Sequence, residues 1–313
     1  MSLFDRNYLL RISDLDDDNN IIQFEVRPPF NVDFNCGRRI SGSSLDIIIY
    51  GLGEKKRLLL SKRNYEFAQS LVVENGILQS NPIDGLKKVS AERGGKELIV
   101  ELLVGYGDDS NLRQIYIGEI LQVKNSLSSV GFETYIECIS DLSARNKYYS
   151  TRTITNKVDA IEKLMKDAGL EVGTIAPVGN EYIRPKVISG RPLEILKKMA
   201  NITEIFYTDN GKGYFVPSEG YIEQSIRIIP VQASTGLLNT PSRQSQIVTF
   251  KCMINPNFAL RSIIRLKSFV DPTVDGYYEI FDMIYVGNYE GESWVVDIQA
   301  QERKKREGEI WIE

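Results

Sequence analysis

The sequence contains no histidine among its 313 residues. This absence excludes Ser-His-Asp and Cys-His catalysis, histidine-bearing zinc sites and a histidine pH switch. Cysteine is also scarce: Cys36, Cys138 and Cys252 lie far apart and form no C-x-x-C pair, which excludes thioredoxin-type chemistry and zinc ribbons. Because free cysteines usually behave as small apolar side chains, we expect Cys138 on the apolar face of a strand with Phe132 and Ile136.

Long apolar runs and a large net charge are missing as well. The longest apolar stretches, such as Leu45–Tyr50 and Leu98–Val104, are far shorter than the roughly 18 residues that span a membrane. The net charge is −4, which gives no electrostatic reason to bind nucleic acid or an anionic membrane. Residues 1–6 lack the basic and apolar segments of a secretory signal. We therefore expect no membrane anchor, no specific nucleic-acid binding and assembly in a cytoplasm.

The composition is that of a folded chain. Apolar residues make up 42% and charged residues 26%, and glycine and proline number only 24 and 11. A chain of this length can bury a sizeable core without disulfide or metal support, and it suggests about two domains.

Strand patterns dominate residues 1–150. Turn residues separate the predicted strands, and this spacing favours a small barrel or sandwich over βαβ units. The predicted strands are Tyr8–Ser13, Ile21–Val26, Leu45–Tyr50, Leu98–Val104, Ile115–Val123 and Phe132–Ile139. Residues 54–93 have no clean period; Glu54–Gln69 could form a short helix, but we treat the segment as a connection.

Residues 151–235 change to a helical period and predict a small α+β domain. A helix is expected from Asn156 to Ala168, with Thr155 or Asn156 as N-cap and Gly169 after its end. A second helix should begin at Ser189, with Pro192 in its first turn. Its inward side chains should be Leu193, Leu196, Met199 and Ala200. A hairpin should follow, with strands Glu204–Thr208 and Gly213–Pro217 around the turn 209–212.

Residues 236–313 return to strands and predict a second β-barrel block with a tail. The strands expected are Ile247–Ile254, Ile263–Lys267, Tyr277–Val286 and Ser293–Ala300. In the last one, Trp294, Val296, Ile298 and Ala300 share one face. Strict alternation along Tyr277–Val286 would put Ile280, Ile284 and Val286 on one face and Tyr277, Phe281, Met283 and Tyr285 on the other. A strand that is apolar on both faces needs an outside cover, either a neighbouring domain or another subunit.

Charge is segregated near the C-terminus. Residues 224–270 contain no acid but six basic residues: Arg227, Arg243, Lys251, Arg261, Arg265 and Lys267. Residues 271–302 contain no basic residue but eight acids: Asp271, Asp275, Glu279, Asp282, Glu290, Glu292, Asp297 and Glu302. The pattern has two explanations. Opposite charges could pair across the strands of one sheet, which the pattern alone slightly favours, or the block could have a basic and an acidic side for head-to-tail contact in a ring.

No motif assigns a catalytic, cofactor-binding or metal-binding residue. Asp14–Glu25 has carboxylates at several EF-hand positions, but Asn19 replaces the glycine and the flanks predict strands, so we favour a solvated hairpin loop over calcium. Gly51–Gly53 and Gly105–Gly107 do not continue into nucleotide-binding motifs. The basic clusters 55–63 and 303–306 are typical of solvated faces. No carboxylate pair stands out from the 42 acids.

An ordered series of short motifs runs along the chain from about Tyr8 to Ala300. It consists of Gly105–Gly107 with Ile115–Gly118, then Ala233–Leu238, Ile254–Asn257, Ile263–Ser268, Asp275–Ile280 and Ser293–Ile298. The series resembles the baseplate hub proteins of contractile-tailed phages, in which "GY … F-x-G", "TGL", "NP", "G-x-x-V-x-L", "DG-x-Y-x-V" and a Trp-bearing last strand occur in this order. Arg261-Ser262 stand where glycine is usual in that family, and Tyr116 stands where phenylalanine is common.

The resemblance implies a mainly β fold, with two tube-type β-barrels and a small α+β domain in each chain. It also implies a homotrimer that adapts a six-fold tail tube to a three-fold central spike and forms part of the DNA channel of a virion tail baseplate. The implied partners are the tail tube protein, the spike protein, neighbouring baseplate proteins and the tape measure protein. It favours the ring interpretation of the charge blocks, with fewer bases than acids facing the channel. The alternatives are a β-barrel tail enzyme or receptor- or carbohydrate-binding tail protein, and a tube initiator without spike contacts.

Overall fold

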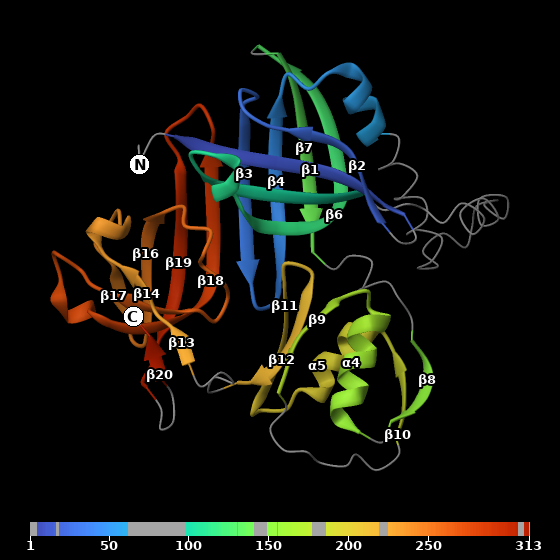
Figure 1. The fold of residues 1–313 in the computed structure, drawn as a ribbon, viewed down its shortest axis with the longest axis vertical. Coiled ribbons are helices and arrows are strands. Elements are labelled where there is room, and N and C mark those ends of the chain that lie inside the picture. Colours follow the sequence, from blue (N-terminus) through green and yellow to red (C-terminus); the bar gives the residue numbers. More distant parts are fainter. Residues whose placement is uncertain are drawn as a thin grey trace.

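The computed structural model describes residues 5–16, 19–61, 98–129, 131–140, 149–154, 156–176, 186–218, 225–305 and 310–312. The chain is mainly β, as the sequence predicts, and one large sheet runs through most of it (Figure 1). None of the described helices has the length and apolar character needed to cross a bilayer.

The N-terminal block forms seven antiparallel strands. They are β1 Arg6–Asp16, β2 Asn19–Val26, β3 Val32–Arg39, β4 Gly42–Tyr50, β5 Leu98–Tyr106, β6 Arg113–Ser128 and β7 Gly131–Ile139. The sequence analysis missed β3, and a short helix occupies residues 54–61 where a connection was expected. Residues 62–97, which include the rest of that connection, lie outside the described part. Figure 1 shows β1 crossing over β3 and β4, so the sheet curls around a core.

The strand β7 matches its predicted alternation except at its start. Ile136 and Cys138 are buried, but Phe132, on the same face, is 46% exposed. Its ring carries the Arg57 guanidinium 3.7 Å above the centroid, a cation–π contact at the rim of the sheet. The predicted shared face of Phe132, Ile136 and Cys138 is therefore confirmed, but Phe132 lies at the exposed start of the strand.

The described residues of the α+β unit, between 149 and 218, form two helices and two small sheets. Its elements are β8 Tyr149–Ile154, α4 Lys157–Asp167, β9 Glu171–Ile175, β10 Lys186–Gly190, α5 Pro192–Met199, β11 Glu204–Asp209 and β12 Lys212–Pro217. The Asn156 side chain accepts a hydrogen bond from the Val158 amide (2.9 Å) and caps α4, as predicted. The helix α5 begins at Pro192 rather than Ser189, because Ser189 belongs to β10, which pairs with β8. Asn210 and Gly211, both with positive φ, form the predicted hairpin turn.

The C-terminal block contains short and long strands. They are β13 Ser225–Arg227, β14 Ile229–Val231, β15 Ser242–Gln244, β16 Ile247–Met253, β17 Ile263–Leu266, β18 Gly276–Asn288, β19 Trp294–Glu302 and β20 Ile310–Ile312. The strand β13 pairs with β20 and β14 with β17, so residues 225–231 pair within this block although the predicted boundary follows residue 235. The half-buried pattern predicted for β19 is confirmed, since Trp294, Val296, Ile298 and Ala300 are buried.

A bulge in β18 overturns the face assignment made by strict alternation. The register against β19 shifts between Ile280 and Asp282, so one extra residue, Phe281, is inserted. As a result Ile280 shares the core face with Met283 and Tyr285, and all three are buried. The sequence prediction had placed Ile280 opposite the other two, because periodicity alone does not reveal an inserted residue.

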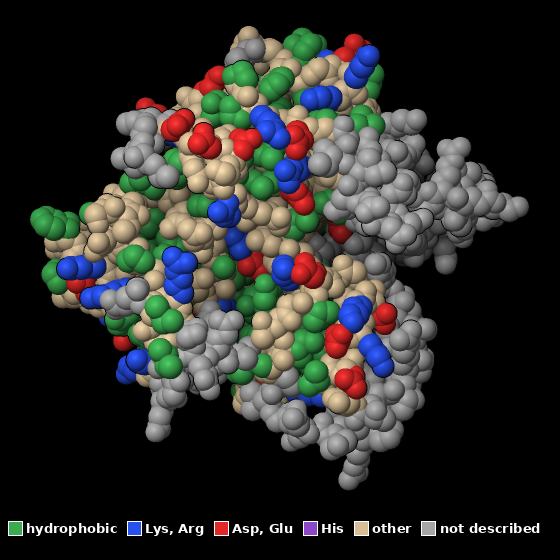
Figure 2. Space-filling model, viewed as in Figure 1, with side chains coloured by type: hydrophobic (Ala, Val, Ile, Leu, Met, Phe, Trp, Pro, Cys, Tyr) green, Lys and Arg blue, Asp and Glu red, His purple; other side chains and the backbone are tan. Residues whose placement is uncertain are grey.

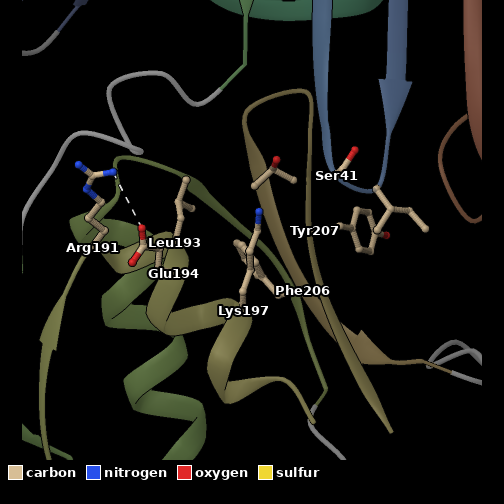
Figure 3. Close-up of a pocket in the computed structure, with 9 residues that line it drawn as sticks. Ser41, Arg191, Leu193, Glu194, Lys197, Phe206 and Tyr207 are labelled. Carbon is tan, nitrogen blue, oxygen red and sulfur yellow. Dashed lines mark ion pairs between the residues drawn. The ribbon is translucent and has the colours of Figure 1, made fainter. Parts of the chain in front are cut away.

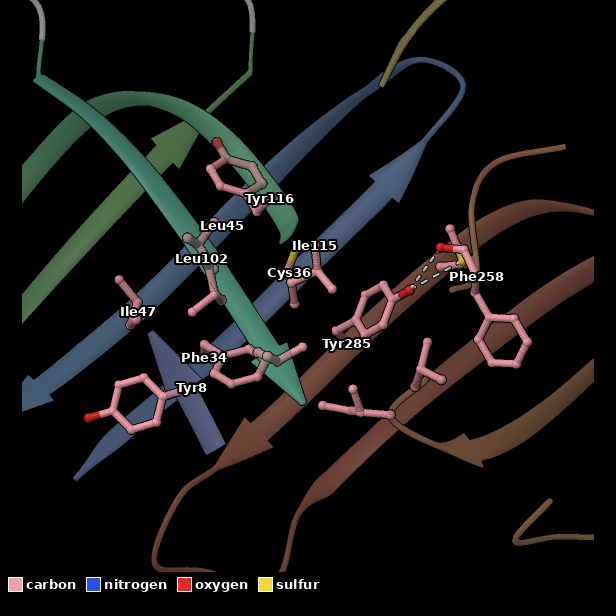
Figure 4. Close-up of a cluster of buried hydrophobic side chains, with 14 of the residues drawn as sticks. Tyr8, Phe34, Cys36, Leu45, Ile47, Leu102, Ile115, Tyr116, Phe258 and Tyr285 are labelled. Atoms are coloured by element: carbon pink, nitrogen blue, oxygen red, sulfur yellow. Dashed lines mark hydrogen bonds between the residues drawn. The ribbon is translucent and has the colours of Figure 1, made fainter. Parts of the chain in front are cut away.

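One continuous sheet joins the two β-rich blocks. The strand β18 pairs antiparallel with β3 through seven residue pairs, from Asp282–Arg39 to Asn288–Asp33. The strands β18 and β19 accordingly stand beside β3 and β4 (Figure 1). The main hydrophobic cluster includes Leu45 and Ile47 from one block and Phe258 and Tyr285 from the other (Figure 4). The two blocks therefore share a single core.

The two blocks repeat the same five-strand frame. In the N-terminal unit, strands β3 to β7, the sheet order is β3-β4-β7-β6-β5; in the C-terminal unit, strands β15 to β19, it is β15-β16-β19-β18-β17. All pairings within both frames are antiparallel. Each strand therefore has a counterpart of the same rank in the other unit.

The equivalence extends to single residues. The strand β6 has a bulge against β7 between Ile120 and Gln122, as β18 has against β19 between Ile280 and Asp282. The residues before these bulges match, Glu119-Ile120 in β6 and Glu279-Ile280 in β18. Glu119 pairs with Ile99 in β5, and Glu279 pairs with Ile263 in β17. The units are therefore two copies of one structural pattern.

Candidate assembly site

A buried arginine joins all three parts of the chain. Arg38 lies near the C-terminal end of β3, on the buried face of the strand, and is 2% exposed. Its Nε and Nη2 donate to the two oxygens of Asp209, at the end of β11, at 3.1 and 2.6 Å. Its Nη1 donates to the Phe258 carbonyl oxygen at 3.3 Å. The same carbonyl oxygen accepts a hydrogen bond from the Tyr285 hydroxyl at 3.4 Å. The N-terminal unit, the α+β unit and the C-terminal unit therefore meet at one guanidinium.

Electrostatics keeps this guanidinium charged. Burial by itself lowers the pKa of Arg38, but the Asp209 carboxylate and its hydrogen bonds outweigh burial and hold that pKa above its ordinary value. A paired, fork-shaped contact of this kind fixes orientation as well as distance. The arrangement sets the angle between the α+β unit and the sheet.

A second arginine holds the exit from the α+β unit. Arg261 Nη1 donates to the Pro217 carbonyl oxygen at 2.7 Å, and its Nε pairs with Glu279 at 2.8 Å. Its backbone has a φ of 66°, the left-handed region that favours glycine. A left-handed φ strains a residue with a side chain, and the contacts of the Arg261 side chain compensate for that strain.

Three basic residues of the charge blocks pair within the chain. Arg243 pairs with Glu302, Lys251 with Asp297 at 3.5 Å, and Arg261 with Glu279. Lys251 and Asp297 are directly opposite on β16 and β19. Lys251–Asp297 is the cross-strand pair that the sequence favoured, whereas Arg243 reaches Glu302 past the intervening β16 and Arg261 lies in the loop before β17. Arg227, Arg265 and Lys267 are exposed. On the face in Figure 2, acidic and basic side chains lie intermingled.

The acidic loop considered for calcium is a hairpin between strands, as its flanks predict. Glu25 of β2 pairs with Arg27 at 2.7 Å and with Arg11 at 3.0 Å. The Arg27 hydrogen bond is the main reason that the pKa of Glu25 lies below its ordinary value. The side chains of residues 14–23 are outside the described part, and the described residues hold no group of three or more acids or cysteines placed to bind a metal.

The three cysteines are free and buried. Burial raises the pKa of the Cys36 and Cys252 thiols to about 12 and also raises that of Cys138. Thiols of this kind are poor nucleophiles, and they pack as small apolar side chains, as the sequence predicts.

Two clefts of the structure contain carboxylates, the groups that an enzyme without histidine would need in pairs. A cleft of about 250 Å³ lies between α5 and the β3–β4 turn, and its one carboxylate, Glu194, faces Arg191 at 3.9 Å (Figure 3). A second cleft, of about 540 Å³, contains Glu302, which pairs with Arg243, and Asp275, which accepts from the Ser268 amide at 2.7 Å. Glu302 and Asp275 therefore hold structural contacts, whereas Glu194 is exposed and is the only carboxylate of its cleft.

An apolar pair projects from the C-terminal unit. Phe269 and Val270, between β17 and β18, are 94% and 71% exposed. Hydrogen bonds brace their loop: Ser268 Oγ accepts from the Asp271 amide at 3.0 Å, and Asp275 accepts from the Ser268 amide. A braced loop that presents a large aromatic side chain is typical of a contact surface.

Within the described residues the sheet has open edges at β2 and β14 as well as at β15 and the C-terminal half of β6. The strand β15 is the last strand at one end, and all three of its residues are exposed. The C-terminal half of β6 is flanked by β7 on one side and by no strand of the described chain on the other. Unpaired edges are available for strand addition.

Comparison with known proteins supplies a family. A family model described as baseplate hub gp41 matches residues 45–293 of the chain. No curated protein has a significant sequence match.

Several solved structures share the fold. A tail protein from Neisseria meningitidis MC58 has a TM-score of 0.56 at 8% identity, over 94% of this chain and 96% of that chain. The 43 kDa tail protein of prophage MuSo2 from Shewanella oneidensis has a TM-score of 0.52 at 8% identity, with the same coverage. The E. coli c3393 protein, a type VI secretion component similar in structure to the T4 bacteriophage tail proteins gp27 and gp5, has a TM-score of 0.55 at 10% identity, over 88% of this chain and 75% of that chain.

Proposed function

The chain belongs to the baseplate hub gp41 family, and on this premise we propose that it assembles as a homotrimer that adapts a six-fold tail tube to a three-fold central spike. As a family member it is a structural component of a phage tail baseplate. The finer role rests on symmetry: a chain with two equivalent units needs three copies to present six units around one axis.

The observation that carries the proposal is the repeated five-strand frame. Its order, its antiparallel pairings and its bulge recur in both units. A six-fold tube can meet six similar units, while the α+β units, one in each chain, keep three-fold symmetry. The same ring therefore offers a pseudo-six-fold face and a three-fold face.

The ring would surround the channel through which DNA passes. Contacts between basic side chains and phosphates add affinity through counterion release, so a channel that lets DNA pass should be poor in exposed bases. Three of the six bases in the basic block are already paired with acids of the same chain. We expect fewer of these bases than of the eight acids to face the channel.

The proposed partners are the tail tube protein, the spike protein, neighbouring baseplate proteins and the tape measure protein. The braced Phe269–Val270 pair is the exposed apolar feature of the C-terminal unit best suited to a partner contact. Localisation in the virion baseplate follows from the family, and we propose assembly in the host cytoplasm.

We expect no catalytic role for this chain. The cleft beside α5 contains a single carboxylate, Glu194, rather than a pair, and in the second cleft Glu302 and Asp275 hold structural contacts. The purified chain should not hydrolyse peptidoglycan. Turnover that disappears when one carboxylate is changed would instead favour the tail-enzyme alternative.

The deciding experiment is density of assembled tails. We expect three copies of the chain and six β units around the axis, between tube and spike. One copy, or six copies that each contribute one unit, would contradict the trimer. Arg243, Lys251, Arg261, Arg265 and Lys267 lining the channel would contradict the channel argument.

A further inference from the structure

The strand β18 divides its outer edge between two neighbours. Its N-terminal half pairs with β17, from Gly276–Leu266 to Glu279–Ile263. Its C-terminal half, after the bulge, pairs with β3, the first strand of the other unit. The junction between the units is thus made by the half of β18 that β17 does not cover.

The equivalent strand β6 is divided in the same way, but its second half has no such neighbour. Its N-terminal half pairs with β5 from Arg113 to Glu119. After the bulge, Gln122–Leu127 pairs with β7 on one side, and no described strand pairs with its other side. This edge corresponds to the edge of β18 that β3 covers.

The strand that corresponds to β3 is β15, and it too has an open side. It pairs with β16, as β3 pairs with β4, and in the described chain no strand follows it in the sheet. Its side chains, Ser242, Arg243 and Gln244, are all exposed. One chain therefore carries two unmatched edges that correspond to the two halves of its own internal junction.

We propose that β15 of one copy adds antiparallel to the C-terminal half of β6 in a neighbouring copy, repeating between chains the β18–β3 junction found within each chain. This inference rests on the proposed homotrimer and names its contact. The contact is head-to-tail, so it uses different surfaces on the two copies and closes when the ring is complete. It also covers two of the edges that the described sheet leaves open.

The internal junction supplies the register. There Ile284 pairs with Gly37, Tyr285 with Cys36 and Val286 with Asn35. Transfer through the repeated frame places Lys124 opposite Gln244, Asn125 opposite Arg243 and Ser126 opposite Ser242 of the neighbour. The antiparallel direction follows from the internal junction.

The charge of the two junctions differs. Arg39 and Asp282 form an ion pair of 2.9 Å across the internal junction. The residues at the corresponding positions are Gln246 and Gln122, which are uncharged. The contact between copies therefore relies on backbone hydrogen bonds, without an ion pair at that position.

The test is a disulfide between copies. In the full chain carrying Lys124→Cys and Gln244→Cys, the two new thiols face each other across neighbouring copies, where directly opposed Cβ atoms lie about 4.5–5.5 Å apart. Oxidation should yield covalent dimers and trimers on a denaturing gel. The native thiols are buried and should not compete. Because the disulfide accumulates under oxidation, even a transient contact is captured.

Matched controls isolate register. Ile284→Cys with Gly37→Cys occupies the equivalent internal positions and should form a disulfide within one chain. Lys124→Cys with Ser242→Cys is two residues out of register, about 7–8 Å apart, and should give at least about tenfold less cross-linked product. Ser126→Cys with Ser242→Cys is an independent in-register pair at exposed positions, for use if the first variant folds poorly.

The outcomes separate the contact from the trimer. The inference would be overturned if the in-register pairs gave no more interchain product than the out-of-register pair, in an experiment where the internal control does cross-link. Native mass spectrometry of the same sample measures the oligomer independently. A trimer without these cross-links would leave the proposed hub role standing and remove only the β15–β6 contact.

Discussion

The N-terminal and C-terminal units share a frame and differ in what lies beside it. In the N-terminal unit, β5 is flanked by β1, an antiparallel strand of 11 residues. In the C-terminal unit, the equivalent β17 is flanked by β14, a parallel strand of three residues. The frame therefore accepts a neighbour of either direction and length. The two units share the order and pairing of the five strands in the frame, and they differ in the strands beside it.

The largest expected effect comes from a feature present in only one unit. Arg38 extends from β3, whereas β15, the equivalent strand, ends at Gln244 before the corresponding position. Arg38→Met leaves the Asp209 carboxylate buried without its partner, and we expect a loss of about 3–5 kcal/mol in the free energy of unfolding, measured by urea denaturation. The double variant Arg38→Met/Asp209→Leu should recover much of that loss, and failure to recover would mean that packing rather than charge dominates this junction.

A matched pair of core substitutions tests whether the units unfold together. Ile136 in β7 and Ile298 in β19 occupy equivalent positions, and both are fully buried. Either Ile→Ala change should cost about 2–5 kcal/mol, because it leaves a cavity. Since the β18–β3 junction makes the sheet and its core continuous, both variants should shift one common transition in denaturant, followed by tryptophan fluorescence and circular dichroism. Two separate transitions, each sensitive to one variant, would show that the units are independent.

A smaller effect is expected at the internal junction. Arg39 is half exposed, and its ion pair with Asp282 should contribute about 0.2–1 kcal/mol, measured by a double-mutant cycle with alanine. Added salt should reduce this coupling. The equivalent residues Gln122 and Gln246 should show no salt-dependent coupling in the association of copies, which distinguishes the two junctions.

The smallest effect concerns the β1–β2 hairpin, which has no counterpart among the described residues of the C-terminal unit. The Arg27 hydrogen bond and the contact with Arg11 lower the pKa of Glu25. A carboxyl whose pKa is lower in the folded chain contributes stability above its unfolded pKa of about 4.3, and this contribution disappears as the pH falls through the folded value. Glu25→Gln should therefore cost a few tenths of a kcal/mol at neutral pH and nothing at acid pH, measured by unfolding across that range. A constant cost at all pH values would contradict this explanation.

Local patterns predicted much of the fold. The helix α4, the β11–β12 hairpin and the faces of β19 follow from periodicity and turn residues, and all three are present. The strand β3 was missed because a charged residue, Arg38, continues the alternating buried positions Val32, Phe34 and Cys36. The arginine interrupts the apolar pattern by which a strand is predicted. Its burial depends on Asp209, 171 residues away, which no local pattern contains. An arginine continuing an alternating apolar series is the one signal that could have indicated the junction.

The bulge in β18 and the repeated frame were hidden for a related reason. Both are defined by pairing between distant strands, and the repeat leaves only short sequence traces such as Glu119-Ile120 and Glu279-Ile280. The positive φ of Arg261 was not predicted either, because an arginine gives no local sign of a left-handed backbone.

The shortness of β15 bears on how newly made chains remain soluble. Pro241, which lacks a backbone N–H, precedes its three residues, and Ser245, at a φ of 58°, turns the chain away after them. Two free copies that collide can therefore form only a few backbone hydrogen bonds, too few to repay the entropy of association. In the proposed ring, so short a strand disfavours open filaments and favours assembly on a template that already holds several copies side by side.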